Sequence, residues 1–430
     1  MNKYVEYGLS LYDNGLLAEA EEAFNKVLVA EPLCAAAYQG LGVVYFSKNE
    51  FDKSIEFSMK AVDLYGNAQQ SRVSECFLNL AIAFKAKKDI QNALFCYENA
   101  IMLNVNNYDA YFGISVTYLL NKDFENGFKL YRSRFFRTEP VIAHFVEDKK
   151  EWQGEKIKNK NLYVCSEQGF GDNIQFVRYL KELSERTGAN VFYKPYAELE
   201  GLFEENDLGV QIIKNSTEDA QVDFDAYTHL LSIPQLMKAS VESIPLSGGY
   251  LMPNKSKVKK YKNKYFNNKK FKLGIVWRGT LDPYIEKVIP LKNVVKFLNV
   301  PNVEVYSFQV NLTDVETREL EKYNIHNLES TFKDFSDTAA AIENLDLLIS
   351  VDTSVAHLAG AMNKPVWVLL PYIPEWRWFL DSEKSPWYDS AKLYRQDESR
   401  NWDSVFKKVS QDLEASVLYY LTTSGNAFKL

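Results

Sequence analysis

Cysteine is scarce in this chain, and its few cysteines form no pattern. The 430 residues include four cysteines, which lack the short spacings typical of metal ligands. Scattered free thiols are usual in a reducing cytosol, so we expect unpaired cysteines and a cytoplasmic protein. No Asp-x-Asp motif stands where it would bind a metal, and we expect no metal. The cysteines are Cys34, Cys76, Cys96 and Cys165.

Long apolar runs and an excess of positive charge are also missing. No run reaches the roughly 18 residues that cross a bilayer, so we expect no membrane span. The chain opens directly into a helical pattern, without an apolar signal segment. A formal net charge of −7 argues against a general nucleic-acid binder. The overall composition, 46% hydrophobic and 25% charged residues, is ordinary for a globular protein. The length of the chain predicts two or three domains.

An internal repeat of about 34 residues occupies the first third of the chain. Small and aromatic residues recur at the signature positions of tetratricopeptide helix pairs, with a short insertion near residues 65–71. Such pairs must stack, because one pair cannot bury its own apolar face. We therefore predict a tetratricopeptide-repeat (TPR) domain over 1–135 whose concave surface binds a peptide or protein; the alternative is a structural cap on the next domain. Signature residues of successive copies are Tyr4, Gly8, Ala20, Phe24 and Pro32; Tyr38, Gly42, Tyr45 and Ala61; Leu80, Ala81, Ala93 and Tyr97; and Tyr111, Ile114, Gly127 and Tyr131.

A first α/β domain is predicted over 158–253, after a polar junction at 136–157. A strand at 161–166 is followed by a two-glycine turn at 167–172 and a helical pattern at 173–187. Gly169 and Gly171 would allow a ligand to approach the backbone closely. His229 ends a later strand, where it would face a cleft or lie buried in the core.

A lysine-rich stretch separates this domain from the next. Residues 254–270 include eight lysines. Such a run could bind nucleic acid or anionic lipid. On an acidic protein we favour a solvated helix and linker.

The region 271–430 is predicted to form a second α/β domain with a closing helix. Residues 345–370 have the pattern of strand, helix and strand, with Asp352, Thr353 and Ser354 where the first strand ends. Ligands bind at this edge of open α/β sheets, and helix N-termini attract anions there. Arg278 and Phe308 follow two other strands of the same predicted sheet.

Three motifs resemble a known group of enzymes. The stretches 166–172, 352–360 and 374–378 closely resemble bacterial TPR glycosyltransferases, whose catalytic region is related to glycosyltransferase family 9, the heptosyltransferases. The resemblance implies a GT-B fold of two Rossmann-like domains. It also implies an inverting, metal-independent reaction that uses a nucleotide-sugar donor and no other cofactor. The same layout resembles protein O-glycosyltransferases, including bacterial enzymes that modify flagellin.

The resemblance gives roles to individual residues. Asp172 matches the proposed general base, although a carboxylate at a helix start has a structural use as well. Asp352 matches the residue that holds donor-sugar hydroxyls, or it caps the helix. The N–H groups of Thr353 and Ser354 suit a phosphate, which Lys287 would also bind.

Other candidates are less closely tied to the motifs. Arg278 is a second phosphate candidate, and the sequence around Arg278 and Lys287 departs from the commoner family pattern. Phe308 and Gln309 would meet the nucleobase and ribose, or Phe308 belongs to the core. His357 contacts the donor or is a buried structural histidine. Acceptor-side candidates are Glu167, Gln168, His229 and Trp376.

These observations favour a protein glycosyltransferase whose TPR domain selects a Ser/Thr acceptor, for which flagellin or another surface protein is plausible by resemblance. One alternative is a heptosyltransferase-like enzyme that acts on lipopolysaccharide or a capsule glycan. Another is a scaffold whose GT-B unit no longer turns over, which the departures near Arg278 and Lys287 would explain.

Overall fold

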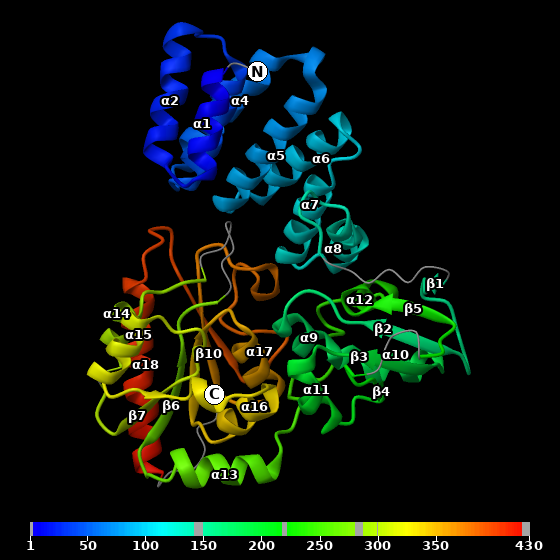
Figure 1. The fold of residues 1–430 in the computed structure, drawn as a ribbon, viewed down its shortest axis with the longest axis vertical. Coiled ribbons are helices and arrows are strands. Elements are labelled where there is room, and N and C mark those ends of the chain that lie inside the picture. The colour runs from blue at the N-terminus through cyan, green and yellow to red at the C-terminus, as the bar shows by residue number, and fades with distance from the viewer. Residues whose placement is uncertain (1–2, 142–148, 217–221, 280–286, 299, 424–430) are drawn as a thin grey trace. The chain divides into compact units, whose positions relative to one another are not determined.

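The computed structural model describes residues 3–141, 149–216, 222–279, 287–298 and 300–423. Its contacts divide the chain into two compact units, Met1–Val141 and Ile142–Leu430 (Figure 1). Each unit is described by itself.

The N-terminal unit consists of helices that pack in consecutive pairs. Small residues let these helices approach closely: the ring of Phe24 lies so near Gly8 and Gly40 that a Cβ atom at either would come within 2.7 and 2.4 Å of it. The predicted insertion is a short 3-10 turn at Asn67–Gln69. The predicted helical repeat is therefore confirmed. The helices are α1 (Lys3–Asp13), α2 (Leu17–Ala30), α3 (Ala35–Ser47), α4 (Phe51–Tyr65), α5 (Gln70–Ala86), α6 (Ile90–Leu103), α7 (Tyr108–Leu120) and α8 (Phe124–Leu130).

The second unit begins with a parallel sheet in the order β1-β5-β2-β3-β4. Its first strand, Lys150–Glu151, lies within the stretch predicted as a junction, and Trp152 beside it is buried. The domain therefore starts before residue 158. Its elements are β1 (Lys150–Glu151), β2 (Asn161–Cys165), α9 (Phe170–Phe176), α10 (Leu180–Thr187), β3 (Asn190–Lys194), α11 (Ala197–Glu204), β4 (Gln211–Ile212), β5 (Ala226–His229) and α12 (Ile233–Leu236).

The helix after β2 starts earlier than the sequence predicts. It begins at Phe170, so Gly171 and Asp172 belong to its first turn rather than to the preceding loop. A 3-10 turn at Val177–Tyr179 then separates α9 from α10. The start of α9 consequently holds Asp172 in a fixed helical position.

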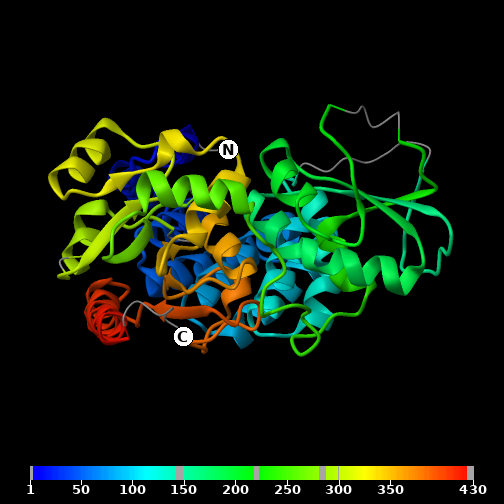
Figure 2. The same ribbon diagram turned by 90° about the horizontal axis from the view of Figure 1, so that it is seen from below.

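A second parallel sheet has the order β11-β10-β9-β6-β7-β8. Apolar side chains of its strands pack with those of the last helix in one hydrophobic core. Figure 2 shows α18 and α13 on opposite faces of this sheet. The elements are α13 (Lys255–Tyr265), β6 (Phe271–Val276), α14 (Leu291–Val294), β7 (Val303–Ser307), α15 (Asp314–Lys322), β8 (His326–Asn327), α16 (Phe335–Glu343), β9 (Leu347–Val351), α17 (Ser354–Ala361), β10 (Val366–Leu370), β11 (Ala391–Arg395) and α18 (Asp403–Thr422).

The lysine-rich stretch forms α13, in agreement with the solvated helix that we favoured. Tyr261 is buried on one side of it and donates a hydrogen bond to the Thr331 carbonyl. Lys259, Lys260 and Lys262 are exposed. One face of α13 thus packs against α16, and the other meets solvent.

Two helices, α9 and α17, join the two α/β domains. Helix α9 follows a strand of the first sheet, α17 follows a strand of the second, and the two pack together. Gly171 makes this approach possible, because a Cβ atom there would lie 2.9 Å from the His357 ring and 3.3 Å from the Ser354 Cα. The fold class predicted from the sequence, helical repeats followed by two Rossmann-like domains, is confirmed. Nowhere in the described part of the chain does a helix combine the length and hydrophobicity needed to cross a membrane.

Candidate active site

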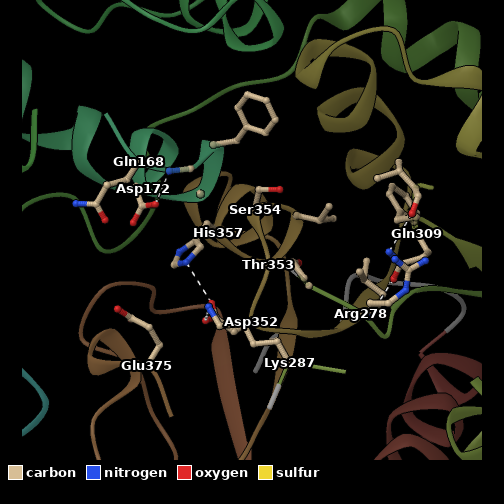
Figure 3. Close-up of a pocket in the computed structure, with 18 of the residues that line it drawn as sticks. Gln168, Asp172, Arg278, Lys287, Gln309, Asp352, Thr353, Ser354, His357 and Glu375 are labelled. Atoms are coloured by element: carbon tan, nitrogen blue, oxygen red, sulfur yellow. Dashed lines mark hydrogen bonds and ion pairs between the residues drawn. The ribbon is translucent and has the colours of Figure 1, made fainter. Parts of the chain in front are cut away.

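A cavity of about 890 Å³ lies where the carboxyl ends of both sheets meet. Every strand end that reaches it belongs to a parallel strand, the position at which α/β sheets bind ligands. The first α/β domain contributes Gln168 to Asp172, Tyr196 and Glu198. The second contributes Val276, Arg278, Gly279, Lys287, Phe308 to Asn311, Asp352 to Val355, His357, Glu375 and Arg377. Figure 3 shows Asp172 on the first-domain side, with Asp352, Lys287 and Glu375 on the other.

Asp352 is the centre of a buried charge cluster on the second domain. Its Oδ2 atom lies 2.7 Å from Lys287 Nζ, and its Oδ1 atom lies 3.5 Å from His357 Nε2. Burial alone would raise the pKa of Asp352, but the Lys287 charge and His357 outweigh it and hold that pKa well below its ordinary value. Asp352 is therefore ionised at neutral pH and can accept hydrogen bonds from sugar hydroxyls.

Lys287 and His357 respond differently to this cluster. Burial would lower the pKa of Lys287, yet the charges of Asp352 and Glu375 raise it, so the side chain keeps its positive charge. Burial lowers the pKa of His357 despite the nearby Asp352, so His357 is neutral at pH 7. Its Nδ1 atom is 2.9 Å from the Tyr388 hydroxyl, and its ring stacks on Trp378. His357 thus both packs structurally and borders the cavity.

Helix α17 points its N-terminus into the cavity. Thr353, rather than Asp352, is the N-cap: its Oγ1 atom accepts a 3.3 Å hydrogen bond from the Ala356 N–H. Ser350 fixes the cap, with 2.8 Å between the two hydroxyl oxygens. The first N–H groups of a helix have no partner within the helix and attract anions. This end of the cavity therefore suits a phosphate.

Across the cavity, Asp172 is held in place from two sides. Its Oδ2 atom accepts a 2.8 Å hydrogen bond from the Gly169 N–H, and its Oδ1 atom forms an ion pair with Arg377 Nη2. Arg377 also donates to the Gln175 side chain at 2.7 Å and to Glu375. A guanidinium of the second domain therefore fixes the rotamer of a first-domain carboxylate.

Glu375 completes this arrangement. Its Oε2 atom accepts a 3.0 Å hydrogen bond from the Arg377 N–H, in addition to the ion pair between the two side chains. Burial raises the pKa of Glu375 to about 7, against the opposing charge of Arg377. The Glu375 carboxyl at the cavity wall therefore titrates near neutral pH.

Several predicted donor residues line the cavity but are already engaged. Arg278 forms a 3.2 Å ion pair with Glu316. The Gln309 Oε1 atom accepts hydrogen bonds from the Trp277 and Arg278 N–H groups, at 3.3 and 2.9 Å. Phe308 is buried against Phe332. These side chains order the strand ends, and the backbone from 308 to 311 forms the adjacent wall.

Three acceptor-side candidates do not line the cavity. Glu167 is fully buried and accepts a 2.9 Å hydrogen bond from the Leu231 N–H. His229 is equally buried, 3.7 Å from Glu151. The Trp376 ring packs against the Arg377 guanidinium, with 4.3 Å between the ring centroid and Arg377 Cζ. These three side chains pack away from the cavity, whereas Gln168 borders it.

Sequence reasoning missed Glu375 and Arg377 as site residues, although both lie in a motif that it singled out. In that motif only Trp376 was predicted, as an acceptor-side candidate. Tyr196 and Glu198 were also missed. The signal for them is that the chain between the end of β3 and the first turn of α11 lies at the carboxyl edge of the sheet. Among the residues that the structure describes, no group of three or more His, Cys, Asp or Glu side chains has a geometry suited to a metal ion.

The two parallel sheets and their shared cavity, preceded by helical repeats, define a TPR chain with a pair of Rossmann-like domains. Residues 7–68 match the tetratricopeptide repeat family model. The chain is 23% identical to Protein FlbA of Caulobacter vibrioides over 429 residues, which cover 92% of this chain and 70% of FlbA.

Two solved structures are similar to the second unit. The structure of E. coli ADP-heptose LPS heptosyltransferase II shares 13% identity, with a TM-score of 0.47 over 61% of this chain and 99% of that one. The glycosyl transferase family 9 structure from Veillonella parvula shares 12% identity, with a TM-score of 0.44 over 60% and 90% of the two chains.

Proposed function

We propose that this protein is an inverting, metal-independent glycosyltransferase that moves a sugar from a nucleotide-sugar to Ser or Thr of a protein acceptor. One observation carries the proposal: Asp172 borders the same cavity as Asp352, Lys287 and the N-terminus of α17. A carboxylate and the N-terminus of α17 thus border the same space of about 890 Å³, within the range of ligand pockets. The motif resemblance to TPR glycosyltransferases points to the same chemistry.

Inversion requires one direct displacement at the anomeric carbon. The acceptor oxygen attacks, its proton passes to a base, and the bond to the donor phosphate breaks. Asp172 is the proposed base, since it is the first-domain carboxylate that is fixed at the cavity wall. Lys287 and the first N–H groups of α17 would stabilise the negative charge on the leaving phosphate. Asp352 would hold sugar hydroxyls and orient the donor.

The TPR domain would select the acceptor. Stacked repeats of this kind form extended concave surfaces for binding, and a protein substrate would explain their presence in the chain. Flagellin or another surface protein is the acceptor that the motif resemblance suggests. A cytoplasmic location, where the cysteines would stay reduced, is part of the same proposal.

Asp172→Asn tests the proposed base. The amide retains the shape of the side chain but cannot accept the proton, so we expect transfer to fall by roughly 10²- to 10⁴-fold. Transfer is measured as a mass increment on candidate acceptor proteins incubated with this protein and a panel of nucleotide-sugars. The control is Asp207→Asn, whose carboxylate is 80% exposed and lies outside the cavity. Unchanged transfer in Asp172→Asn would remove Asp172 from the mechanism.

Nucleotide binding tests the donor site independently of turnover. Lys287→Met removes the positive charge beside Asp352, so calorimetry should show weaker binding of nucleoside diphosphates by about tenfold or more. Failure of every nucleoside diphosphate to bind the unchanged protein would contradict the proposed function.

A further inference from the structure

The two walls of the cavity differ in charge. All the basic side chains among its described lining residues, Arg278, Lys287 and Arg377, come from the second α/β domain. The first domain contributes two carboxylates, Asp172 and Glu198, and no basic residue. In Figure 3 the labelled basic residues, Arg278 and Lys287, lie on the second-domain side together with Asp352 and Glu375, and Asp172 lies on the first-domain side.

The basic side chains are already paired with carboxylates. Lys287 lies 2.7 Å from Asp352, and Arg278 lies 3.2 Å from Glu316. Arg377 is shared between Asp172 and Glu375. An incoming anion on the first-domain side would therefore meet the exposed Glu198 and would compete with existing ion pairs for the positive charges of Arg278, Lys287 and Arg377.

The rest of the first-domain wall is neutral and suited to hydrogen bonding or stacking. Gln168 offers an amide, Tyr196 a half-buried phenol and Phe170 a half-buried ring. Glu198 lies in the first turn of α11 and is exposed at the cavity. A neutral or positively charged chain would find partners on this wall, whereas a phosphorylated or carboxylated one would be repelled.

We infer that the acceptor is a Ser- or Thr-bearing peptide segment with neutral or basic neighbours, and that Glu198 selects against anionic acceptors such as acidic glycans. This inference rests on the proposed function, in which the first domain faces the acceptor. It disfavours the heptosyltransferase-like alternative, whose lipopolysaccharide or capsule acceptor would bring negative charge to the same wall.

The test is a binding measurement on the full chain that needs no donor and no turnover. Saturation-transfer NMR would compare two capped hexapeptides with the same Ser-Thr centre, flanked by lysines or by glutamates, and trigalacturonic acid as an anionic glycan. We expect the lysine peptide to bind about tenfold more tightly than the glutamate peptide or the glycan. Glu198→Lys should abolish or reverse this preference.

The matched control is Glu185→Lys, which makes the same charge change at an exposed residue of α10 outside the cavity. It should leave the preference unchanged, and any peptide bound elsewhere on the chain would respond equally to both variants. Equal or tighter binding of the glutamate peptide or the glycan, equal behaviour of the two variants, or no binding of either peptide would overturn the inference. Failure of the proposed function would instead appear as absent nucleotide binding and transfer.

Discussion

Arg377 determines how Asp172 is presented to the cavity, because it joins the carboxylates of Asp172 and Glu375 and the Gln175 amide. Arg377→Lys keeps the charge but loses the planar fork that reaches all three partners. If the substitution displaces the proposed base, Asp172, by about 1 Å, the rate of transfer should fall on the order of 10²-fold. We expect kcat to fall by about this factor while the affinity for nucleoside diphosphate, measured by calorimetry, stays within about twofold. A parallel loss of nucleotide binding would show that Arg377 supports the whole cavity rather than Asp172 alone.

Glu375 gives the protein a pH dependence of stability. Burial raises its folded-state pKa to about 7 from an ordinary value of 4.5. Between these values the unfolded chain releases a proton that the folded protein keeps, so stability falls as the pH rises, and the loss is complete above about 7. Glu375→Gln cannot ionise and removes this effect. The difference in Tm, variant minus unchanged protein, should therefore increase from pH 5 to pH 8. A difference that stays constant or decreases would contradict the assignment.

At this scale the recognisable motifs singled out Asp172 and Asp352, and both line the cavity. The sequence did not predict the orientation of side chains whose contacts lie far away along the chain. Glu167 immediately precedes Gln168, yet its side chain turns inward to the Leu231 N–H. Arg377 reaches Asp172 across more than 200 positions of sequence, and no local pattern encodes such a contact.

At the scale of elements, the contact between α9 and α17 sets the distance between the two walls of the cavity. Gly171→Ala would place a Cβ atom 2.9 Å from the His357 ring and 3.3 Å from backbone. Overpacking of this kind costs about 1 to 3 kcal/mol, and the lowered Tm should be accompanied by lost transfer. Gly169→Ala is the matched control for Tm alone, because a Cβ there meets no ring or backbone, only Asp172 Oδ2 at 3.2 Å, and its φ of −88° suits alanine. Equal Tm values for the two variants would show that α9 and α17 can separate freely.

The elements themselves were largely predictable, because apolar runs such as 347–351 and 366–370 are buried throughout and lie between clear helix patterns. The short strand β1 was not. Its two residues, Lys150 and Glu151, are polar, and they form a strand only because β5 offers an open edge for pairing. The start of α9 was misplaced for a related reason: glycines favour a turn by propensity, but the Asp172 bond to the Gly169 N–H stabilises a helix start there.

At the scale of the whole molecule, the question is whether the TPR domain and the two α/β domains perform separable tasks. The chain divides between residues 141 and 142 into units with their own cores, and every residue that lines the cavity belongs to the second unit.

A chain that starts at residue 136 should therefore bind nucleoside diphosphates as the full chain does. If the repeats select the acceptor, transfer to a protein should fall by about 10²-fold, the scale of gain expected when two binding modules are linked. Calorimetry and acceptor mass measured on the same preparation separate the two effects. Undiminished protein transfer would show that the cavity alone recognises its acceptor, whereas lost nucleotide binding would show that the second unit needs the repeats to fold.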